Sequence, residues 1–248
     1  MVDEDWAEYL TAFHSERAGI TEAVLERAHD ASGRTPYQWA AEAVPDDAVV
    51  VDLACGSAPM AVRLRPRQYV GLDLSWAELT MAAVRSASVA QADATRLPLR
   101  ACSADVVTMS MALMLVPLAE TLAEVKRVLR PGGTFVATLP HTRPMPPRDW
   151  LRYARLCVAL RHPVWSYPND RALAHAPVAF RSAGLSLIED EQHGFSCNVA
   201  NVGVADQLLA SLYLPDVAPQ RMEAGRAVAR RWVGTEIAVP IRRLVAAL

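Results

Sequence analysis

Short apolar segments alternate with helix-like segments between residues 48 and 140, and this alternation constrains the fold more than any other feature. The first apolar segment, AVVVDL at 48–53, is continuous and β-branched, as expected for a strand buried on both faces of a parallel sheet. Further strands are predicted at 68–74, 88–93, 104–111 and 134–140. Because right-handed crossovers join strands that alternate with helices, the sequence predicts a doubly wound α/β sheet with helices on both faces.

Helix signals fall between the predicted strands. Pro59 stands where a helix could begin, since the first helical position needs no N–H donor. Ser75 and Glu78 form an S-x-x-E capping box that predicts the start of the next helix. A further helix is predicted at 118–129, where one face is apolar and Pro131 follows the last turn.

The remaining segments are predicted to complete a single domain. Residues 1–43 are predicted to form a helical lid of two helices separated by Gly19. Residues 44–140 are predicted to form the core. The other predicted parts are a cap insert at 141–170, a helix at 171–185, strands at 186–197 and 235–248, and a helical insert at about 203–232. Seven strands are therefore expected in all. Pro240 favours an edge or bulged position for its part of the last strand.

Composition narrows the class of protein. Of 248 residues, 52% are hydrophobic and 21% are charged, which is typical of a globular chain. The 25 Lys and Arg residues are scattered and the net charge is −2, so neither a nucleic acid nor a membrane is predicted as a partner. The four cysteines form no CxxC pair, which argues against a zinc cluster or a disulfide framework and favours a reducing cytoplasm. The acidic N-terminus and the lack of an apolar run of roughly 18 residues predict neither a signal peptide nor a membrane span.

Aspartates end three successive predicted strands, at Asp52, Asp73 and Asp93. The carboxyl ends of parallel strands line one crevice. An acid about 20 residues beyond a glycine turn, at the end of a second strand, is the arrangement that binds ribose hydroxyls, and Asp73 lies 17 residues past Gly56. One such aspartate often only caps a helix, but three in register favour a cofactor site.

The turn after the first strand excludes two classes of nucleotide site. A dinucleotide dehydrogenase carries G-x-G-x-x-G here, whereas this chain has A-x-G-x-A from Ala54 to Ala58. A P-loop needs a lysine followed by Ser or Thr, and neither follows the turn.

Five motifs in order, VVDLACGSA, VGLDLS, QADATRLPL, ADVVTMSMALMLV and EVKRVLRPGGTFVATLP, resemble those of class I S-adenosylmethionine-dependent methyltransferases of the small-molecule, methyltransferase-11-like type. The resemblance covers about residues 46–140. It implies a Rossmann-like, mostly parallel sheet of seven strands and S-adenosylmethionine as the cofactor. The residues that it implies in cofactor binding are Asp52, Ala54, Gly56, Asp73, Leu74, Asp93, Ala94 and Ser110.

Within that set, the resemblance divides the cofactor among the motifs. The first acid, the glycine turn and either Ser110 or Met111 meet the methionine part, and Asp73 binds the ribose hydroxyls. Leu74 packs on the adenine, whose edge is met by Asp93 and the N–H of Ala94. Alanine replaces the commoner glycine at two positions of the turn. A residue with Cβ does not easily adopt positive φ, so if Ala58 crowds the methionine end, binding should be weak and Ala58→Gly should tighten it.

Three further residues are candidates for the chemistry. Methyl transfer can gain about 7–11 kcal/mol from positioning alone, but an oxygen acceptor of high pKa also favours a general base. His14 in the lid and His141 after the fifth strand are the candidates for that base. Arg17 is expected to pair with the cofactor carboxylate. No cluster of metal ligands is recognisable, so no metal is predicted.

The acceptor is expected to be a small, partly apolar molecule, methylated on a hydroxyl or carboxyl oxygen, as in secondary metabolism. The N/D-P-P-Y/F motif of methyltransferases that act on exocyclic amines of nucleic-acid bases or on protein glutamine is absent. No proline precedes Cys102 or Cys157, as it does in carbon-5 pyrimidine enzymes. The candidate aromatic pocket consists of Trp150, Tyr153, Trp165 and Tyr167. A cofactor-binding module, decarboxylase or cyclase of the same fold remains an alternative, and an RNA methyltransferase a weaker one. A monomer and a homodimer are both compatible with the sequence.

Overall fold

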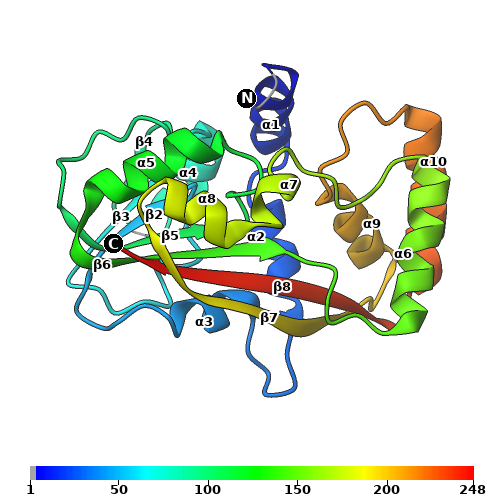
Figure 1. Cartoon of the computed structure of the whole chain (residues 1–248). Helices are drawn as coiled ribbons and strands as arrows, with labels where there is room; N and C mark the ends of the chain where they lie inside the picture. Colours follow the sequence, from blue (N-terminus) through cyan, green and yellow to red (C-terminus); the bar gives the residue numbers. More distant parts are fainter. Residues whose placement is uncertain (1–3, 86) are drawn as a thin grey trace.

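The computed structural model describes residues 4–85 and 87–248 and contains an eight-stranded sheet, in the order β1-β7-β8-β6-β5-β2-β3-β4 (Figure 1). The strands are β1 (Ala28–His29), β2 (Val49–Leu53), β3 (Gln68–Asp73), β4 (Val89–Gln91), β5 (Ala104–Ser110), β6 (Leu129–Pro140), β7 (Ser186–Asn198) and β8 (Glu236–Ala247). Strands β2 to β6 pair in parallel, whereas β8, β7 and β1 join the sheet antiparallel. The predicted mostly parallel α/β sheet is confirmed, with an additional short strand, β1, from a segment expected to be helical.

The helices are α1 (Glu4–Glu16), α2 (Ile20–Leu25), α3 (Pro36–Ala41), α4 (Trp76–Ala83), α5 (Leu118–Val128), α6 (Pro147–Leu160), α7 (Asp170–Leu173), α8 (Ala176–Ser182), α9 (Val202–Ala210) and α10 (Pro219–Ala229), and a 3-10 turn, η1, covers Arg230–Trp232. Two helix predictions were wrong. Residues 59–63 form turns instead of a helix beginning at Pro59. The segment 171–185 is broken before α8, because Pro177 has no N–H to donate to the carbonyl of Leu173.

The central strands are buried on both faces, which explains their continuous β-branched sequences. Val51 and Val107 pack in a core that includes side chains of α5 and α8. Their neighbours Val50 and Val106 pack in a second core on the opposite face. Successive side chains of a strand alternate between faces, so each of these strands needs apolar residues at consecutive positions.

Pro240 lies where β8 extends beyond its partner β6. The ladder between these strands ends at the pair Pro140 and Ile241, while β8 continues beside β7 as far as Glu236. Pro240 therefore needs no N–H for the β6 ladder, and its carbonyl accepts a hydrogen bond from the His141 N–H at 3.0 Å. The expected local edge position is confirmed within a strand that is otherwise central.

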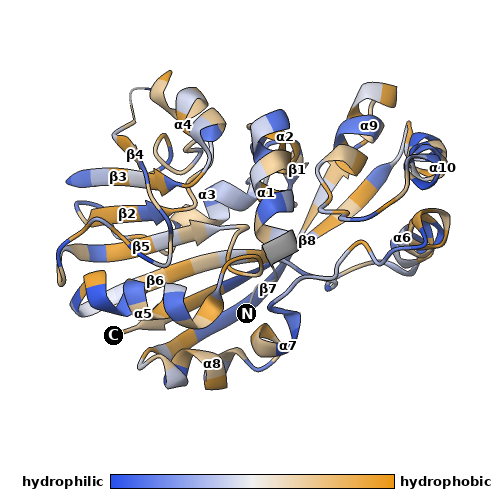
Figure 2. Ribbon diagram, turned by 90° about the horizontal axis from the view of Figure 1, so that it is seen from above, coloured by the Kyte–Doolittle hydropathy of each residue, from blue (hydrophilic) through white to orange (hydrophobic). Residues whose placement is uncertain are grey.

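Helices α6, α9 and α10 form a separate group at one end of the molecule (Figure 1). Leu156, Leu208 and Trp232 are buried in the apolar cluster that these helices share. Seen from above, α1 and α2 lie between this group and the carboxyl ends of β2, β3 and β5 (Figure 2). The two helical inserts and the N-terminal helices thus meet at the end of the sheet where the three aspartates lie.

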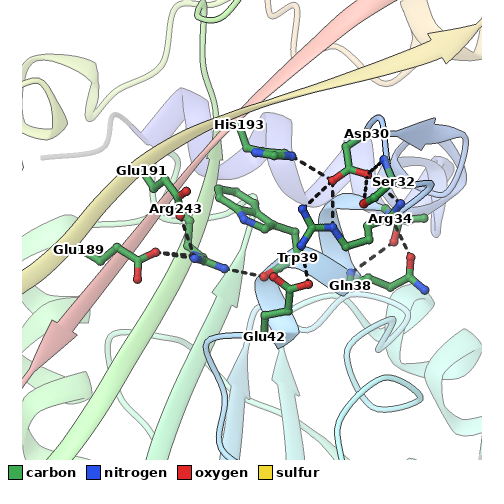
Figure 3. Close-up of polar contacts among 11 residues, drawn as sticks. Asp30, Ser32, Arg34, Gln38, Trp39, Glu42, Glu189, Glu191, His193 and Arg243 are labelled. Atoms are coloured by element: carbon green, nitrogen blue, oxygen red, sulfur yellow. Dashed lines mark hydrogen bonds and ion pairs between the residues drawn. The ribbon is translucent and has the colours of Figure 1, made fainter.

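A polar network fixes the N-terminal segment to the antiparallel half of the sheet (Figure 3). His193 on β7 donates from Nε2 to Asp30 at 3.0 Å, and its ring stacks on Trp39 with centroids 5.1 Å apart. The guanidinium of Arg243 on β8 lies 4.4 Å from the centre of the Trp39 ring. Hydrogen bonds from Ser32, and then from Arg34 and His193, hold the pKa of the Asp30 carboxyl well below its usual range. These contacts anchor the segment that leads from α2 to β2.

Candidate functional site

The turn between β2 and residue 59 contains three residues with positive φ at alternate positions. Their φ angles are +50° at Ala54, +54° at Gly56 and +57° at Ala58. Only glycine adopts this left-handed conformation without strain, so both alanines are held there by their surroundings. Ala54 and Gly56 line a cavity, whereas Ala58 is completely buried. Ala58 therefore does not line the cavity, and Ala54 is the alanine that faces the ligand space.

Asp73, at the end of β3, is tied to this turn by its side chain. Its Oδ2 accepts a hydrogen bond from the Gly56 N–H at 2.8 Å, and its Oδ1 accepts one from the Ser75 N–H at 2.8 Å. Burial raises the pKa of the Asp73 carboxyl. The carboxylate lines the same cavity as Gly56, so the second-strand acid and the glycine turn form one unit.

Asp52, at the end of β2, also lines the cavity but is itself only 1% exposed. Its two oxygens accept hydrogen bonds from the hydroxyls of Thr108 and Tyr69, each at 2.7 Å. Burial raises the pKa of this carboxyl to about 6, although both hydroxyls act in the opposite direction. Asp52 thus has a structural role, because these hydrogen bonds link β2 to both of its neighbouring strands, β3 and β5.

The cavity has a volume of about 330 Å³ and lies at the carboxyl ends of the parallel strands. Leu74, Asp93, Ala94 and Ser110 line it together with the turn residues. Asp93 Oδ1 accepts hydrogen bonds from the N–H and the hydroxyl of Thr95, both at 2.8 Å. Every residue that the sequence motifs implied in cofactor binding is thus brought to one cavity of a size usual for a small-molecule site.

His14 projects into this cavity from α1 and is held from two sides. Its Nδ1 lies 3.0 Å from Oε1 of Glu78 on α4, and its Nε2 lies 3.1 Å from the hydroxyl of Tyr213. The other oxygen of Glu78 accepts the Gly19 N–H at 3.0 Å. Glu78 therefore does not complete the predicted capping box. Its side chain turns to α1, and Asp73 takes the Ser75 N–H instead.

Two other predicted residues lie away from the cofactor cavity. The Arg17 guanidinium donates to the Ala210 carbonyl at 3.3 Å and lies 5.0 Å from the centre of the Phe13 ring. Arg17 does not line the cofactor cavity, and its pairing with a cofactor carboxylate stays a prediction. His141 lines a second, smaller cavity, where its Nδ1 accepts the Arg143 N–H at 3.0 Å and burial lowers the pKa of its imidazole.

The second cavity has a volume of about 100 Å³ and is mainly apolar. Of the four predicted aromatic residues, Tyr153, Trp165 and Tyr167 line it. Trp150 is 43% exposed and only meets the edge of Trp165, with ring centroids 6.3 Å apart. Leucines of α9 and the loop after it complete the wall, so the two helical inserts build this cavity together.

Three residues line both cavities: Thr21, Met111 and Tyr213. Met111 follows β5 with φ +59°, another strained conformation for a residue with a side chain. Neither Tyr213 nor Glu78 was a candidate from the sequence. Tyr213 follows α9 and meets a histidine 199 residues away, a contact for which no local pattern gives a signal.

In residues 4–85 and 87–248, no group of three or more His, Cys, Asp or Glu side chains is arranged to hold a metal ion. In those ranges no helix has the length and apolar character needed to cross a bilayer. Cys55, Cys102, Cys157 and Cys197 are all free.

Comparison with known sequences agrees with this geometry. Residues 51–137 match the family model described as a methyltransferase domain. A curated demethylmenaquinone methyltransferase from Mycolicibacterium vanbaalenii is 36% identical over 123 residues, which cover 48% of this chain and 54% of that protein. The chain therefore matches about half the length of this curated relative.

Solved structures show the same fold at low sequence identity. The 4+2 cyclase SpnF has a TM-score of 0.60 at 16% identity, over 96% of this chain and 94% of that one. A SAM-dependent methyltransferase from Thermotoga maritima has a TM-score of 0.56 at 14% identity, over 95% and 98% of the two chains. Residues 51–137 therefore match the methyltransferase domain model, and the chain has the fold of these solved structures.

Proposed function

We propose that this chain transfers a methyl group from S-adenosylmethionine to a small, mostly apolar acceptor, at a hydroxyl or carboxyl oxygen of a secondary metabolite. The observation that carries the proposal is the pair of adjoining cavities. One lies at the strand ends with Asp73 and the glycine turn, the other is apolar, and they share Thr21, Met111 and Tyr213. Such a pair can hold a nucleoside cofactor beside an apolar acceptor.

The residues of the first cavity fit the cofactor. Within residues 4–85 and 87–248, the Asp73 carboxylate accepts only backbone N–H groups, and it retains acceptor capacity for ribose hydroxyls. Asp93 and the N–H of Ala94 would meet the adenine edge, with Leu74 against its face. A Cβ added at Gly56 would lie 3.6 Å from Glu78 Oε2, within the space that the cavity offers to the methionine part.

The chemistry needs little from the protein besides positioning. When bound, S-adenosylmethionine supplies a methyl carbon on a sulfonium sulfur, so an acceptor electron pair forms the new bond and the carbon–sulfur pair stays on sulfur. The chain aligns the two cavities, and α1, which contributes residues to the first, is the candidate lid over the strand ends. His14 is the candidate base beside the cofactor. His141, in the second cavity, is a candidate for contact with the acceptor.

Calorimetric titration with S-adenosylmethionine and S-adenosylhomocysteine tests the cofactor assignment. The wild type should bind both, and Asp73→Ala should bind at least about tenfold more weakly, because a hydrogen bond to a charged group contributes about 1.5–3 kcal/mol. The proposal fails if neither compound binds at high micromolar concentration and Asp73→Ala behaves like the wild type.

Transfer of a labelled methyl group separates an enzyme from a binding protein. Incubation with panels of phenols, carboxylic acids and sugars should label at least one class. The fold is also that of SpnF, named a cyclase. Tight cofactor binding with no labelled product would therefore favour a protein with other chemistry. Label in total cellular RNA that falls with added salt would favour an RNA substrate instead.

A further inference from the structure

Two hydroxyl groups lie at the junction of the cavities, and one of them has no partner. Thr21 and Tyr213 line both cavities. The Thr21 hydroxyl oxygen is buried and makes no hydrogen bond to any part of the chain in 4–85 and 87–248. A buried hydroxyl without a partner carries a free-energy penalty, which a ligand atom bound at that point would remove. The junction thus offers a hydrogen-bonding group to a polar ligand atom, between walls that are otherwise apolar.

When the His14 imidazole is neutral, its two contacts fix which way a proton can move. Glu78 Oε1 can only accept, so the proton of the imidazole lies on Nδ1, 3.0 Å away. Nε2 then carries a free electron pair and accepts from the Tyr213 hydroxyl at 3.1 Å. Glu78 is fixed in turn by the Gly19 N–H at 3.0 Å. Tyr213 donates its own proton to His14, and its oxygen can accept one from a hydroxyl at the junction, where the Thr21 hydroxyl lies beside it.

We infer that the methyl acceptor is a phenol-type hydroxyl compound whose oxygen binds between the Thr21 and Tyr213 hydroxyls, and that Tyr213 relays its proton to His14. The inference rests on the proposed function. In the proton step, the acceptor's O–H bond breaks as its proton moves to the Tyr213 oxygen. The Tyr213 proton moves at the same time to Nε2 of His14, which becomes an imidazolium paired with Glu78. The acceptor keeps its electron pair as the nucleophile.

The chemistry of the relay selects the class of acceptor. A phenol and a tyrosine have similar unperturbed pKa values of about 10, so exchange of a proton between them is nearly balanced, whereas an aliphatic alcohol would hold its proton far more strongly. Burial raises the pKa of the Tyr213 phenol, so it does not persist as a tyrosinate and must pass a proton on as it takes one. The aromatic wall of Tyr153, Trp165 and Tyr167 suits the ring of such an acceptor.

The test uses 4-nitrophenol, whose phenolate is coloured, bound together with S-adenosylhomocysteine. Absorbance titration against pH should show that the wild type lowers the pKa of bound 4-nitrophenol by about one unit, a tenfold change in ionisation. Tyr213→Phe and His14→Gln should bind it with its solution pKa. Thr21→Val should weaken binding about threefold to tenfold, because one neutral hydrogen bond is lost.

The matched control is Tyr9→Phe. Tyr9 lies on α1, as His14 does. Its hydroxyl accepts a hydrogen bond at 2.8 Å from the N–H of Leu214, the residue that follows Tyr213 in the chain. This variant removes a nearby hydroxyl from outside the relay, so it should keep the lowered pKa of bound 4-nitrophenol. If Tyr9→Phe also abolished the lowered pKa of bound 4-nitrophenol, a general loss of packing around α1, and not loss of the relay, would explain the result.

Nitrogen-15 NMR of the His14 ring gives an independent readout without any acceptor. The expected spectrum is that of the tautomer with the proton on Nδ1, and Tyr213→Phe should shift only the Nε2 resonance. A proton on Nε2 would overturn the relay. So would binding of S-adenosylhomocysteine without any binding or ionisation of 4-nitrophenol, whereas failure to bind S-adenosylhomocysteine would refute the proposed function itself.

Discussion

Asp73 accepts a hydrogen bond from the N–H of Gly56 at 2.8 Å, across 17 residues of chain. The acid that is proposed to bind the ribose thus also holds the turn that approaches the methionine part. A bound cofactor would contact both ends of this pair, so its affinity depends on the charge and the position of one carboxylate. The two motifs are separate in the sequence but act as one element of the site.

The charge of Asp73 can be tested while its hydrogen bond to the turn is kept. Asp73→Asn keeps the shape and one acceptor oxygen, which can accept the Gly56 N–H, but it loses the negative charge and the bond from the Ser75 N–H. Hydrogen bonds to a charged group are about 1 kcal/mol stronger than neutral ones, so we expect S-adenosylhomocysteine to bind roughly fivefold more weakly by calorimetry.

Asp105→Asn is the matched control for that experiment. Asp105 Oδ2 also accepts a backbone N–H, that of Val49, at 2.8 Å. However, Asp105 lies at the amino end of β5, and the cofactor cavity lies at the carboxyl ends of the strands. Its replacement should leave the affinity unchanged within about twofold. Equal losses in both variants would mean that the acids act through stability and not through the cofactor.

Asp52 should make the stability of the fold depend on pH in the acidic range. Burial raises the pKa of its carboxyl from 3.8 in a free chain to about 6 in the folded protein. The folded state therefore binds the proton more strongly. Its stabilising contribution is complete below pH 4 and is lost as the pH rises through 6. A shift of about two units corresponds to a loss on the order of 3 kcal/mol.

Urea denaturation of the wild type and Asp52→Asn at pH 4.5 and pH 7.5 measures this contribution. The free energy of unfolding of the wild type, minus that of the variant, should fall as the pH rises. The variant keeps one acceptor for the Thr108 and Tyr69 hydroxyls, and any mismatch there is the same at both pH values. A difference that stays constant, or that rises with pH, contradicts the raised pKa.

The two alanines with positive φ should respond differently to glycine. Ala54 faces the cavity, so Ala54→Gly relieves left-handed strain and should raise the free energy of unfolding by about 0.5–1 kcal/mol. Ala58 is fully buried, and loss of its methyl group costs about 0.8 kcal/mol, so Ala58→Gly should be close to neutral. Ala227→Gly, on helix α10, is the control and should destabilise by about 1 kcal/mol. Thermal and urea denaturation would show whether this order holds.

The core of the fold could be predicted because its signals are local. The strand β2 is a run of β-branched residues that must be buried on both faces, and the helix α5 has one apolar face before Pro131. The short strand β1 has no such run. It forms because Asp30 and Trp39 bind residues of β7 and β8 more than 150 positions away.

The candidate site was predictable only where the chain order of the motifs determines the geometry. Asp52, Asp73 and Asp93 meet because parallel strands bring their carboxyl ends together. The predicted capping role of Glu78 was wrong. The S-x-x-E pattern also fits a helix start in which Asp73, and not Glu78, accepts the hydrogen bond from the Ser75 N–H, so the Glu78 side chain can bind elsewhere. Tyr213 lies in a loop whose place depends on the packing of α9, and sequence patterns do not report such contacts.

The apolar acceptor cavity depends on close packing between α6 and α10 at Gly225. A Cβ built on Gly225 would lie 2.5 Å from Cδ2 of Leu160, which is 2% exposed and cannot easily move. Alanine favours a helix by about 1 kcal/mol over glycine, but overpacking costs about 1–3 kcal/mol, so Gly225→Ala should destabilise by about 1 kcal/mol. In a Leu160→Ala background the clash is absent, and the same change should stabilise by about 1 kcal/mol. Urea denaturation of the four proteins measures this reversal of sign. Stabilisation by Gly225→Ala in both backgrounds would show that α6 and α10 are less closely packed, and with them the cavity wall that Tyr153 and Leu156 provide.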